Sequence, residues 1–194
     1  MNVSILGCGR WASFHAWYAH HIGHKVTVWG RENSTNLKNL ITTHKNEYLT
    51  LPQDINFTYN LNTALNFADI IIISISSQQL RNLAKQINET NLYQNKTFIL
   101  CMKGIEVSTG KRLSEVLTEE LHGSYNIGVW VGPGHVQDFL QGIPNCMVIS
   151  ANNNEISKKI IQIFSSDLIR FYYSKDLIGT EIGAAAKNVI GIAA

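Results

Sequence analysis

The stretch that decides the fold is Val3-Ser4-Ile5-Leu6-Gly7-Cys8-Gly9-Arg10-Trp11-Ala12. A short apolar strand enters a turn with two glycines, and a small residue follows three positions after the second glycine. In this G-x-G-x-x-A pattern, Gly7 permits the tight turn, Gly9 lets the backbone approach a pyrophosphate, and Ala12 lets the next helix lie close to the strand. The positive end of that helix would face the phosphates. We therefore expect a dinucleotide at this turn. The alternative is a purely structural glycine turn.

Strand and helix signals alternate along the rest of the chain with short connections. Apolar runs predict strands at 25–29, 56–59, 69–74, 97–101, 127–131, 145–150 and 169–173. Helices are predicted at 10–22, 34–44, 61–68, 78–88, 111–121, 136–141, 155–164 and from about 178, with Ser34 as a cap and Gly23 as a stop. Run 69–74 is apolar on both faces, as in a central parallel strand. The pattern predicts an α/β, Rossmann-type doubly wound, mostly parallel sheet with helices on both faces.

Composition excludes several classes of function. With 45% hydrophobic and 15% charged residues the chain should be globular, and a net charge of +2 without basic clusters argues against a nucleic-acid partner. No apolar run is long enough for membrane insertion, so we expect a cytoplasmic protein. Cys8, Cys101 and Cys146 lack metal-ligand spacing and should be reduced. His20 and His24 are four residues apart, but histidines near a helix end more often face the negative end of the helix dipole, and no metal site is expected.

The end of the second predicted strand bears on the choice of cofactor. An acid at this position is typical of NAD binding, because it accepts the ribose hydroxyls. Here the strand ends in Trp29-Gly30-Arg31-Glu32. The Arg31 guanidinium suits the ribose 2′-phosphate of NADP, and we expect NADPH to be favoured, with NAD as the alternative. The competing interpretation is a solvated arginine.

Four further segments follow predicted strands or begin helices on the side where an open sheet binds ligands. They are Ser76-Ser77-Gln78-Gln79-Leu80-Arg81, Lys103-Gly104-Ile105-Glu106, Gly132-Pro133-Gly134-His135 and Glu181-Ile182-Gly183-Ala184-Ala185-Ala186-Lys187-Asn188-Val189-Ile190. Together with the glycine turn, they resemble in order and spacing the bacterial NAD(P)-dependent glycerol-3-phosphate dehydrogenases, over essentially the whole chain. The resemblance implies reversible reduction of dihydroxyacetone phosphate to sn-glycerol 3-phosphate, which feeds phospholipid synthesis.

The resemblance also implies roles for individual residues. Lys187 would be the catalytic acid/base, and Lys103 would lie between nicotinamide and substrate. The substrate site would comprise these two lysines with Gly132 and Gly134. The expected cofactor contacts are Gly7, Gly9, Arg10, Trp11, Ala12, Arg31, Tyr48, Ser76, Gln78, Lys103 and Val136.

Lys187 stands out even without the resemblance. Its neighbours in 183–194 are almost all small or apolar, which predicts a buried helix, and lysine is seldom buried without a partner or purpose. Desolvation lowers the pKa of a lysine and makes it a usable acid. The alternative is a surface lysine whose stem lies on the helix.

Two features depart from the family pattern. The usual Gly-Pro-Ser-Phe segment is Gly132-Pro133-Gly134-His135 here, where His135 would be a second proton donor or, as we favour, a loop histidine. The sequence also ends at Ala194, whereas family members continue into a helical substrate domain. We therefore expect a nucleotide-binding domain over 1–175 and the first helix of a truncated second domain over 176–194. This chain should bind cofactor but turn over poorly. The helix should leave an apolar surface that could support a homodimer.

Three functions remain open from sequence. The first is the cofactor-binding part of a glycerol-3-phosphate dehydrogenase. The second is a related dehydrogenase with another small phosphorylated or carboxylated substrate, suggested by Gly134 and His135. The third is a nucleotide-binding module without catalysis.

Overall fold

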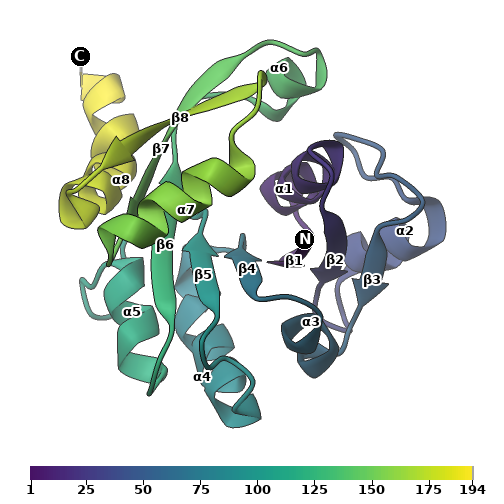
Figure 1. Cartoon of the computed structure of the whole chain (residues 1–194), viewed down its shortest axis with the longest axis horizontal. Helices are drawn as coiled ribbons and strands as arrows, with labels where there is room; N and C mark the ends of the chain where they lie inside the picture. The colour runs from purple at the N-terminus through teal and green to yellow at the C-terminus, as the bar shows by residue number, and fades with distance from the viewer. Residues whose placement is uncertain (194) are drawn as a thin grey trace.

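A sheet of eight strands organises the chain in the computed structural model, which describes residues 1–193 (Figure 1). The strand order is β3-β2-β1-β4-β5-β6-β7-β8. All neighbouring strands are parallel except β6 and β7. The strands are β1 (Asn2–Leu6), β2 (Lys25–Trp29), β3 (Asn56–Thr58), β4 (Ile70–Ile73), β5 (Thr97–Leu100), β6 (Asn126–Val131), β7 (Asn145–Ala151) and β8 (Ile169–Ser174). The predicted Rossmann-type, mostly parallel sheet is confirmed.

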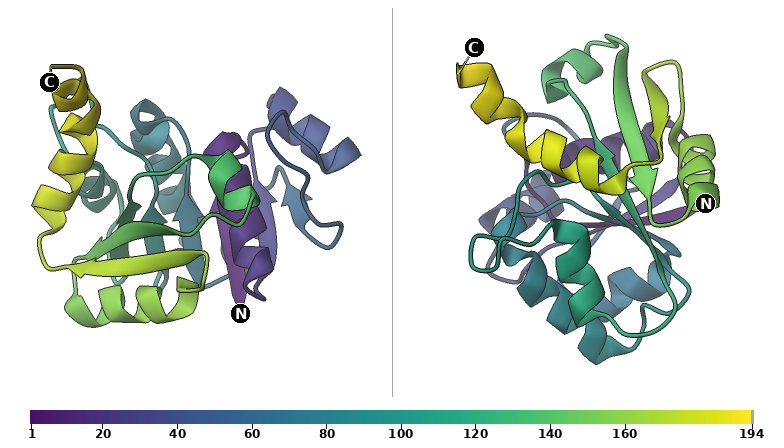
Figure 2. Two further views of the ribbon diagram at one scale, coloured as in Figure 1. Left: turned by 90° about the horizontal axis from the view of Figure 1, so that it is seen from above. Right: turned by 90° about the vertical axis from the view of Figure 1, so that its left-hand side faces the viewer.

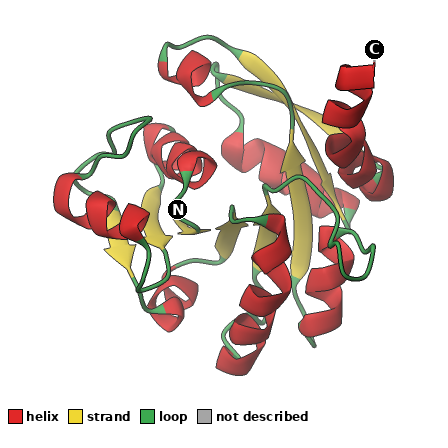
Figure 3. Cartoon of the chain, turned by 180° about the vertical axis from the view of Figure 1, so that it is seen from behind, coloured by secondary structure: helices red, strands yellow, loops and turns green. Residues whose placement is uncertain are grey.

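Helices cover both faces of this sheet (Figures 2 and 3). They are α1 (Arg10–His21), α2 (Thr35–Thr43), α3 (Leu61–Phe67), α4 (Leu80–Thr90), α5 (Leu113–Glu120), α6 (Val136–Leu140), α7 (Asn154–Phe164) and α8 (Leu177–Ala193), with a short 3-10 turn η1 (Ser77–Gln79) before α4. The buried side chains of α1, α2, α6 and α7 join one core cluster, and those of α3, α4 and α5 join the other. None of these helices is long and apolar enough to cross a membrane.

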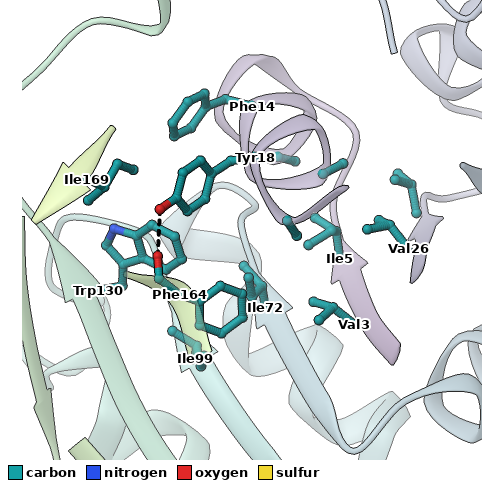
Figure 4. Close-up of a cluster of buried hydrophobic side chains, with 14 of the residues drawn as sticks. Val3, Ile5, Phe14, Tyr18, Val26, Ile72, Ile99, Trp130, Phe164 and Ile169 are labelled. Carbon is teal, nitrogen blue, oxygen red and sulfur yellow. Dashed lines mark hydrogen bonds between the residues drawn. The ribbon is translucent and has the colours of Figure 1, made fainter. Parts of the chain in front are cut away.

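The core beneath α1 joins the two halves of the sheet. Phe14 and Tyr18 of α1 lie against Trp130 of β6 and Phe164 of α7 (Figure 4). The Tyr18 hydroxyl donates to the Phe164 carbonyl at 2.5 Å, and burial raises the pKa of Tyr18 to about 12. Since the strands of this core alternate their side chains between faces, Ile72 joins this cluster while Ile71 and Ile73 face α4.

Two predicted helix boundaries follow from local chemistry. Ser34 caps α2, because its side-chain oxygen accepts from the Leu37 N–H at 3.2 Å. Gly23 ends α1 with φ of 90°, and the N–H groups of Gly23 and His24 bond to the carbonyls of His20 and Ala19. This paired arrangement is the Schellman motif, which favours glycine because the left-handed backbone disfavours a Cβ.

The order of strands reverses between β1 and β4. Strand β1 pairs with β2 on one side, Val3 opposite Val26, and with β4 on the other, Val3 opposite Ile70. The chain therefore crosses from β1 to β2 on one side, and from β4 to β5 on the other. This divergence opens a crevice at their carboxyl ends, which is where open α/β sheets bind ligands.

Helix α8 departs from the sequence prediction. The segment around Lys187 was expected to be buried, and this is wrong: Lys187 is exposed, as are Val189 at 69% and Ile192 at 87%. Glu181 is the buried residue of α8 in the part of the chain that the structure describes. The helix follows β8 and lies at the periphery of the molecule (Figure 2). Small and apolar composition predicted burial, but burial depends on a neighbouring surface that composition does not reveal.

Candidate functional site

A cavity of about 820 Å³ lies at the carboxyl ends of the central strands. Residues of the glycine turn, the ends of β2, β4, β5 and β6, and one residue of α8 line it. Three basic side chains line the cavity, those of Arg10, Arg31 and Lys103. Its other ionisable lining residues are Cys8, Cys101 and His15, and no carboxylate of residues 1–193 lines it. A cavity with this lining favours anions.

The glycine turn forms one wall of this cavity. A Cβ added to Gly7 would lie 2.2 Å from the Ser74 carbonyl oxygen, and the φ of Gly7 is 134°, so only glycine fits beside β4. The Gly7 N–H donates to the Trp29 carbonyl at 2.9 Å, which holds the turn against β2. A Cβ on Gly9 would meet no atom within 4 Å. Gly9 therefore leaves open space where a pyrophosphate could approach the backbone.

The N-terminus of α1 points its backbone donors toward the same space. Gly9 is the N-cap and provides no side-chain cap, and the first turn holds no acidic residue. The first N–H groups of a helix have no partner inside the helix, and their dipoles attract an anion. Arg10 and Trp11 of this first turn also line the cavity. The turn and the helix thus form an anion cradle built from backbone.

Arg31 lies just beyond β2 at the edge of the cavity. Arg31, Ser34 and Asn36 line this end together. Ser34 Oγ is 3.0 Å from Cys8 Sγ, so this edge is tied to the glycine turn. An exposed guanidinium beside a hydroxyl and an amide can bind a phosphate group with charge-assisted hydrogen bonds.

Lys103 and the helix that carries Lys187 lie on the side of the cavity formed by the ends of β5 and β6. Lys103, which follows β5, donates from Nζ to the Gly132 carbonyl at 3.2 Å. Partial desolvation lowers the pKa of Lys103, and the positive charge of Lys187 lowers it further. Asn188, the neighbour of Lys187, lines the cavity itself. The structure therefore brings Lys103 and Gly132 into contact and places Asn188, next to Lys187 in the sequence, at the same cavity.

The other predicted site residues divide into two groups. Ser76 and Ala12 line the cavity, whereas Tyr48, Gln78, Gly134, Val136 and Lys187 are not part of its lining. Tyr48 supports Arg10, whose guanidinium carbon lies 4.6 Å from the centre of the Tyr48 ring. Val136 is fully buried in the core. These roles remain predictions.

Gln78 has a definite structural task. Its side-chain nitrogen donates to the Ile105 carbonyl and its side-chain oxygen accepts from the Val107 N–H, both at 2.9 Å. Gln78 thereby holds the loop that follows Lys103. A Cβ on Gly104, which has φ of 133°, would lie 3.1 Å from Ser77 Oγ. The loop from Lys103 is thus fitted closely to η1.

Glu106 completes the Lys103-Gly104-Ile105-Glu106 segment as a structural residue. Arg81 donates to both Glu106 oxygens at 2.8 and 2.7 Å, and Thr109 donates to one of them. The Arg81 bonds hold the pKa of Glu106 at about 2. Arg81 also pairs with Glu119 and Glu120 of α5, so this network joins α4, the loop and α5.

Sequence reasoning missed His15, which lines the cavity between Trp11 and Trp130. The ring is 2% exposed, and its Nδ1 has no hydrogen-bond partner among the described residues. Burial lowers the pKa of His15 to about 3. Its position one turn after Trp11 on α1 was the available signal. His135 lies outside the cavity lining and is exposed at the start of α6, which fits the interpretation as a loop histidine.

His20 and His24 also have ordinary partners. His20 Nε2 pairs with Asp54 at 2.8 Å, and His24 Nε2 lies 3.2 Å from the Ile163 carbonyl. No group of three or more potential metal ligands gathers within the described part of the chain.

Comparisons with known proteins agree with this geometry. The family described as NAD-dependent glycerol-3-phosphate dehydrogenase N-terminus matches residues 2–157. A glycerol-3-phosphate dehydrogenase [NAD(P)+] of Thermoanaerobacter sp. is 32% identical over 198 residues, covering 100% of this chain and 58% of that protein. The enzyme of the same name from Staphylococcus epidermidis is 35% identical, covering 99% of this chain and 59% of its own length. The chain thus spans somewhat more than half the length of these relatives.

Solved structures show the same fold. The crystal structure of glycerol-3-phosphate dehydrogenase from Coxiella burnetii aligns with a TM-score of 0.88 and 24% identity, covering 99% of this chain and 59% of that one. A pyrroline-5-carboxylate reductase from the same organism aligns with a TM-score of 0.68 at 10% identity, covering 99% of this chain and 66% of that one. The eight-stranded sheet with its flanking helices is therefore an architecture found in these solved dehydrogenase and reductase structures.

Proposed function

This chain belongs to the NAD-dependent glycerol-3-phosphate dehydrogenase N-terminus family, and from that premise we propose that it binds NADP(H) and supplies two lysines for reducing dihydroxyacetone phosphate to sn-glycerol 3-phosphate. The observation that carries the proposal is that Lys103, and Asn188 beside Lys187 on α8, line the same cavity as the glycine turn. The proton donor and the dinucleotide-binding turn would then lie at the same cavity.

The residues present fit a nicotinamide dinucleotide. The open Cβ site of Gly9 and the uncapped N-terminus of α1 suit the pyrophosphate. Arg31, with Ser34 and Asn36, suits the ribose 2′-phosphate, which is our reason for favouring NADPH, with NAD as the alternative. The nicotinamide end would then extend toward Lys103 and Gly132 at the ends of β5 and β6.

The bound cofactor supplies the hydride for the carbonyl carbon, and the chain must supply a proton for the developing alkoxide. A lysine can donate this proton, and a lowered pKa brings its acidity closer to the working pH. Lys103 has such a lowered pKa. We assign proton donation to Lys187, which precedes the cavity-lining Asn188 on α8, and we assign orientation of the carbonyl and of the nicotinamide to Lys103. Gly132 and Gly134 would line the substrate side.

The same proposal covers domain organisation and setting. Residues 1–175 would form the cofactor domain, and 176–194 would be the first helix of the substrate domain. The exposed apolar residues Val189, Ile190 and Ile192 are the surface through which we propose a homodimer, which light scattering would test. The free cysteines Cys8, Cys101 and Cys146 suit the reducing cytoplasm that we propose as the location.

Cofactor binding is tested by titrating NADPH into the chain and following tryptophan fluorescence. Gly9→Asp should abolish binding, because it places a carboxylate where the pyrophosphate would lie. Gly191→Asp is the matched control, since Gly191 also has no atom within 4 Å of its Cβ site but lies near the end of α8. Unchanged affinity in Gly9→Asp would overturn the cofactor assignment.

Catalysis is tested by NADPH oxidation with dihydroxyacetone phosphate in a version of the protein that continues into a substrate domain, because residues 1–194 alone should turn over poorly. Lys187→Ala should lower kcat by about a hundredfold, as expected on losing a general acid, and should leave the Kd for NADPH within twofold. Oxidation supported by another phosphorylated or carboxylated ketone, and not by dihydroxyacetone phosphate, would replace the proposed substrate. Tight NADPH binding without oxidation of any such substrate would favour the non-catalytic module.

A further inference from the structure

Glu181 is a buried carboxylate on the otherwise exposed helix α8. It is 7% exposed, and both of its oxygens are engaged. Oε1 accepts from the backbone N–H of Ser114 at 2.9 Å, and Oε2 accepts from the Ser114 hydroxyl at 2.6 Å and from Arg112 Nη1 at 2.7 Å. Ser114 lies in the first turn of α5, where unpaired N–H groups favour a negative charge. The Glu181 carboxylate therefore occupies the N-terminus of α5 in the way that a bound anion would.

Arg112 connects this contact to the loop that begins with Lys103. Its guanidinium contacts Glu181 and Glu115, and its backbone forms an antiparallel bridge with Ile105. Ile105 is two residues from Lys103. One arginine thus joins the helix that carries Lys187 to the loop that carries Lys103.

Because of the spacing of residues along α8, this contact also affects which face of the helix is turned toward the cavity. Glu181 and Asn188 are seven residues apart, so they lie on one face of the helix, about 10 Å apart along its axis. Glu181 is fixed at α5, and Asn188 lines the cavity. The remaining attachment of α8 is modest: it packs on β6 and β7, with Leu177 and Ala184 partly buried against the core. Thr180 also bonds Ser174 and the Asp176 carbonyl at the start of the helix, so Glu181 is the contact that ties α8 to α5 further along its length.

We propose that Glu181 is a positioning residue: its carboxylate, held by Ser114 and Arg112, fixes the rotation of α8 and thereby places Lys187 and Asn188 opposite Lys103. This inference rests on the proposed function for its catalytic meaning. The anchoring itself is a property of this chain and can be measured without substrate.

A carboxylate is needed for chemical reasons. Glutamine has one oxygen acceptor, whereas Glu181 accepts three hydrogen bonds through two oxygens, and the glutamine NH₂ would face either Arg112 or the Ser114 N–H, both of which are donors. Aspartate is shorter by one methylene and would not reach α5 from the same helix position. Glu181→Gln therefore keeps the size of the side chain and removes one of the two acceptor oxygens.

The first measurement is hydrogen exchange of the α8 backbone. Glu181→Gln should raise exchange in 182–193 by tenfold or more while leaving the strands protected. Glu115→Gln is the matched control, because Glu115 also pairs with Arg112 and bonds its backbone N–H, but it does not contact α8. Ser114→Ala, which removes only the hydroxyl, should raise α8 exchange by a smaller factor of about threefold and gives a second variant if Glu181→Gln unfolds.

The second measurement follows Lys103. Its ammonium can be titrated by NMR after isotopic labelling of lysine side chains. In Glu181→Gln the pKa of Lys103 should rise, because the charge of Lys187 is no longer held close. In Glu115→Gln it should stay at the wild-type value. A purely structural carboxylate would change stability without moving this titration.

Enzyme kinetics distinguish failure of the proposed function from failure of the inference about Glu181. In a version that continues into a substrate domain, Glu181→Gln should lower kcat with dihydroxyacetone phosphate at least tenfold and leave the Kd for NADPH within twofold, since the glycine turn is unchanged. If the wild-type form of that version does not reduce dihydroxyacetone phosphate, the proposed function fails while exchange and titration still test the anchor. Wild-type exchange in α8 and an unmoved Lys103 titration in Glu181→Gln would overturn the inference, as would equal effects in Glu115→Gln.

Discussion

Lowering the pH from 7.5 to 5 should destabilise the cofactor-free protein by about 2 kcal/mol through His15 alone. The ring is enclosed by Trp11, Phe14 and Trp130, with the Trp130 ring centre at 5.1 Å. Its Nδ1 has no hydrogen-bond partner in residues 1–193, so no neighbour stabilises a protonated ring. Burial is the cause of the lowered pKa.

The magnitude follows from the two pKa values. Unfolded His15 has a pKa of 6.5 and folded His15 a pKa of about 3, so between these values the unfolded chain binds more protons. Stability then falls as the pH drops below 6.5, by about 1.4 kcal/mol for each pH unit. At pH 5 the loss is about 2 kcal/mol, and near pH 3 it levels off, because both states are then protonated.

Urea unfolding of the wild type and of His15→Leu at pH 7.5 and pH 5 measures this loss. Leucine has a similar size and cannot be protonated, so the variant should lose about 2 kcal/mol less than the wild type between the two pH values. His21→Leu, on the exposed last turn of the same helix, should keep the wild-type loss. His24, whose pKa is also lowered by burial, contributes equally to all three proteins. Equal losses in wild type and His15→Leu would refute the reasoning.

Three further predictions concern the turn, the cofactor and the ion network. Gly7→Ala should cost about 3 kcal/mol in urea unfolding, because its Cβ would meet the Ser74 carbonyl, whereas Gly9→Ala should cost under about 1 kcal/mol; equal costs would contradict the geometry. Arg31→Ala should raise the Kd for NADPH by about 10- to 100-fold and that for NADH less than twofold in fluorescence titrations, and equal losses would show that Arg31 does not bind the 2′-phosphate. The lowered pKa of Glu106 gives stability that is present above pH 4.5 and is lost as the pH falls toward 2. Glu106→Gln should therefore melt at a lower temperature than the wild type at pH 7, and its melting temperature should fall less steeply between pH 4.5 and pH 2. The same fall in both proteins would show that Glu106 does not have this role.

Local sequence predicted most of the fold, because the deciding interactions are local. The apolar run 69–74 contains β4, Ser34 caps the helix that it precedes, and Gly23 has the left-handed backbone that its place after α1 requires. Strand pairing followed from the alternation of elements. The antiparallel pairing of β7 with β6 was not specified by any local signal, because direction within a sheet depends on how the chain returns.

The parts of the site that sequence did not predict depend on contacts between distant residues. Arg81 and Glu106 are 25 positions apart, and Arg112 and Glu181 are 69 apart. Each pair lies within or near a segment that sequence had singled out, yet no spacing rule links its members. Burial of Lys187 was favoured over the surface alternative for a related reason: the surface that would bury an apolar helix is not encoded in that helix.

The distribution of carboxylates explains why the cavity can hold a polyanion. Of the 14 acidic residues in the chain, Glu106 and Glu181 lie within the segments that contain Lys103 and Lys187, and both are paired with arginines: Glu106 with Arg81 of α4, and Glu181 with Arg112 at the start of α5. Their charges hold the frame in place without opposing Arg31, Lys103 or Lys187. In the proposed function, the phosphates of the cofactor and of the substrate would enter a cavity whose lining side chains include Arg10, Arg31 and Lys103 and no carboxylate within residues 1–193, although the chain as a whole has a net charge of only +2. Under the proposed function, the same arrangement favours a phosphorylated ketone over an uncharged one, because only the phosphate is attracted by the positive charges at the binding step.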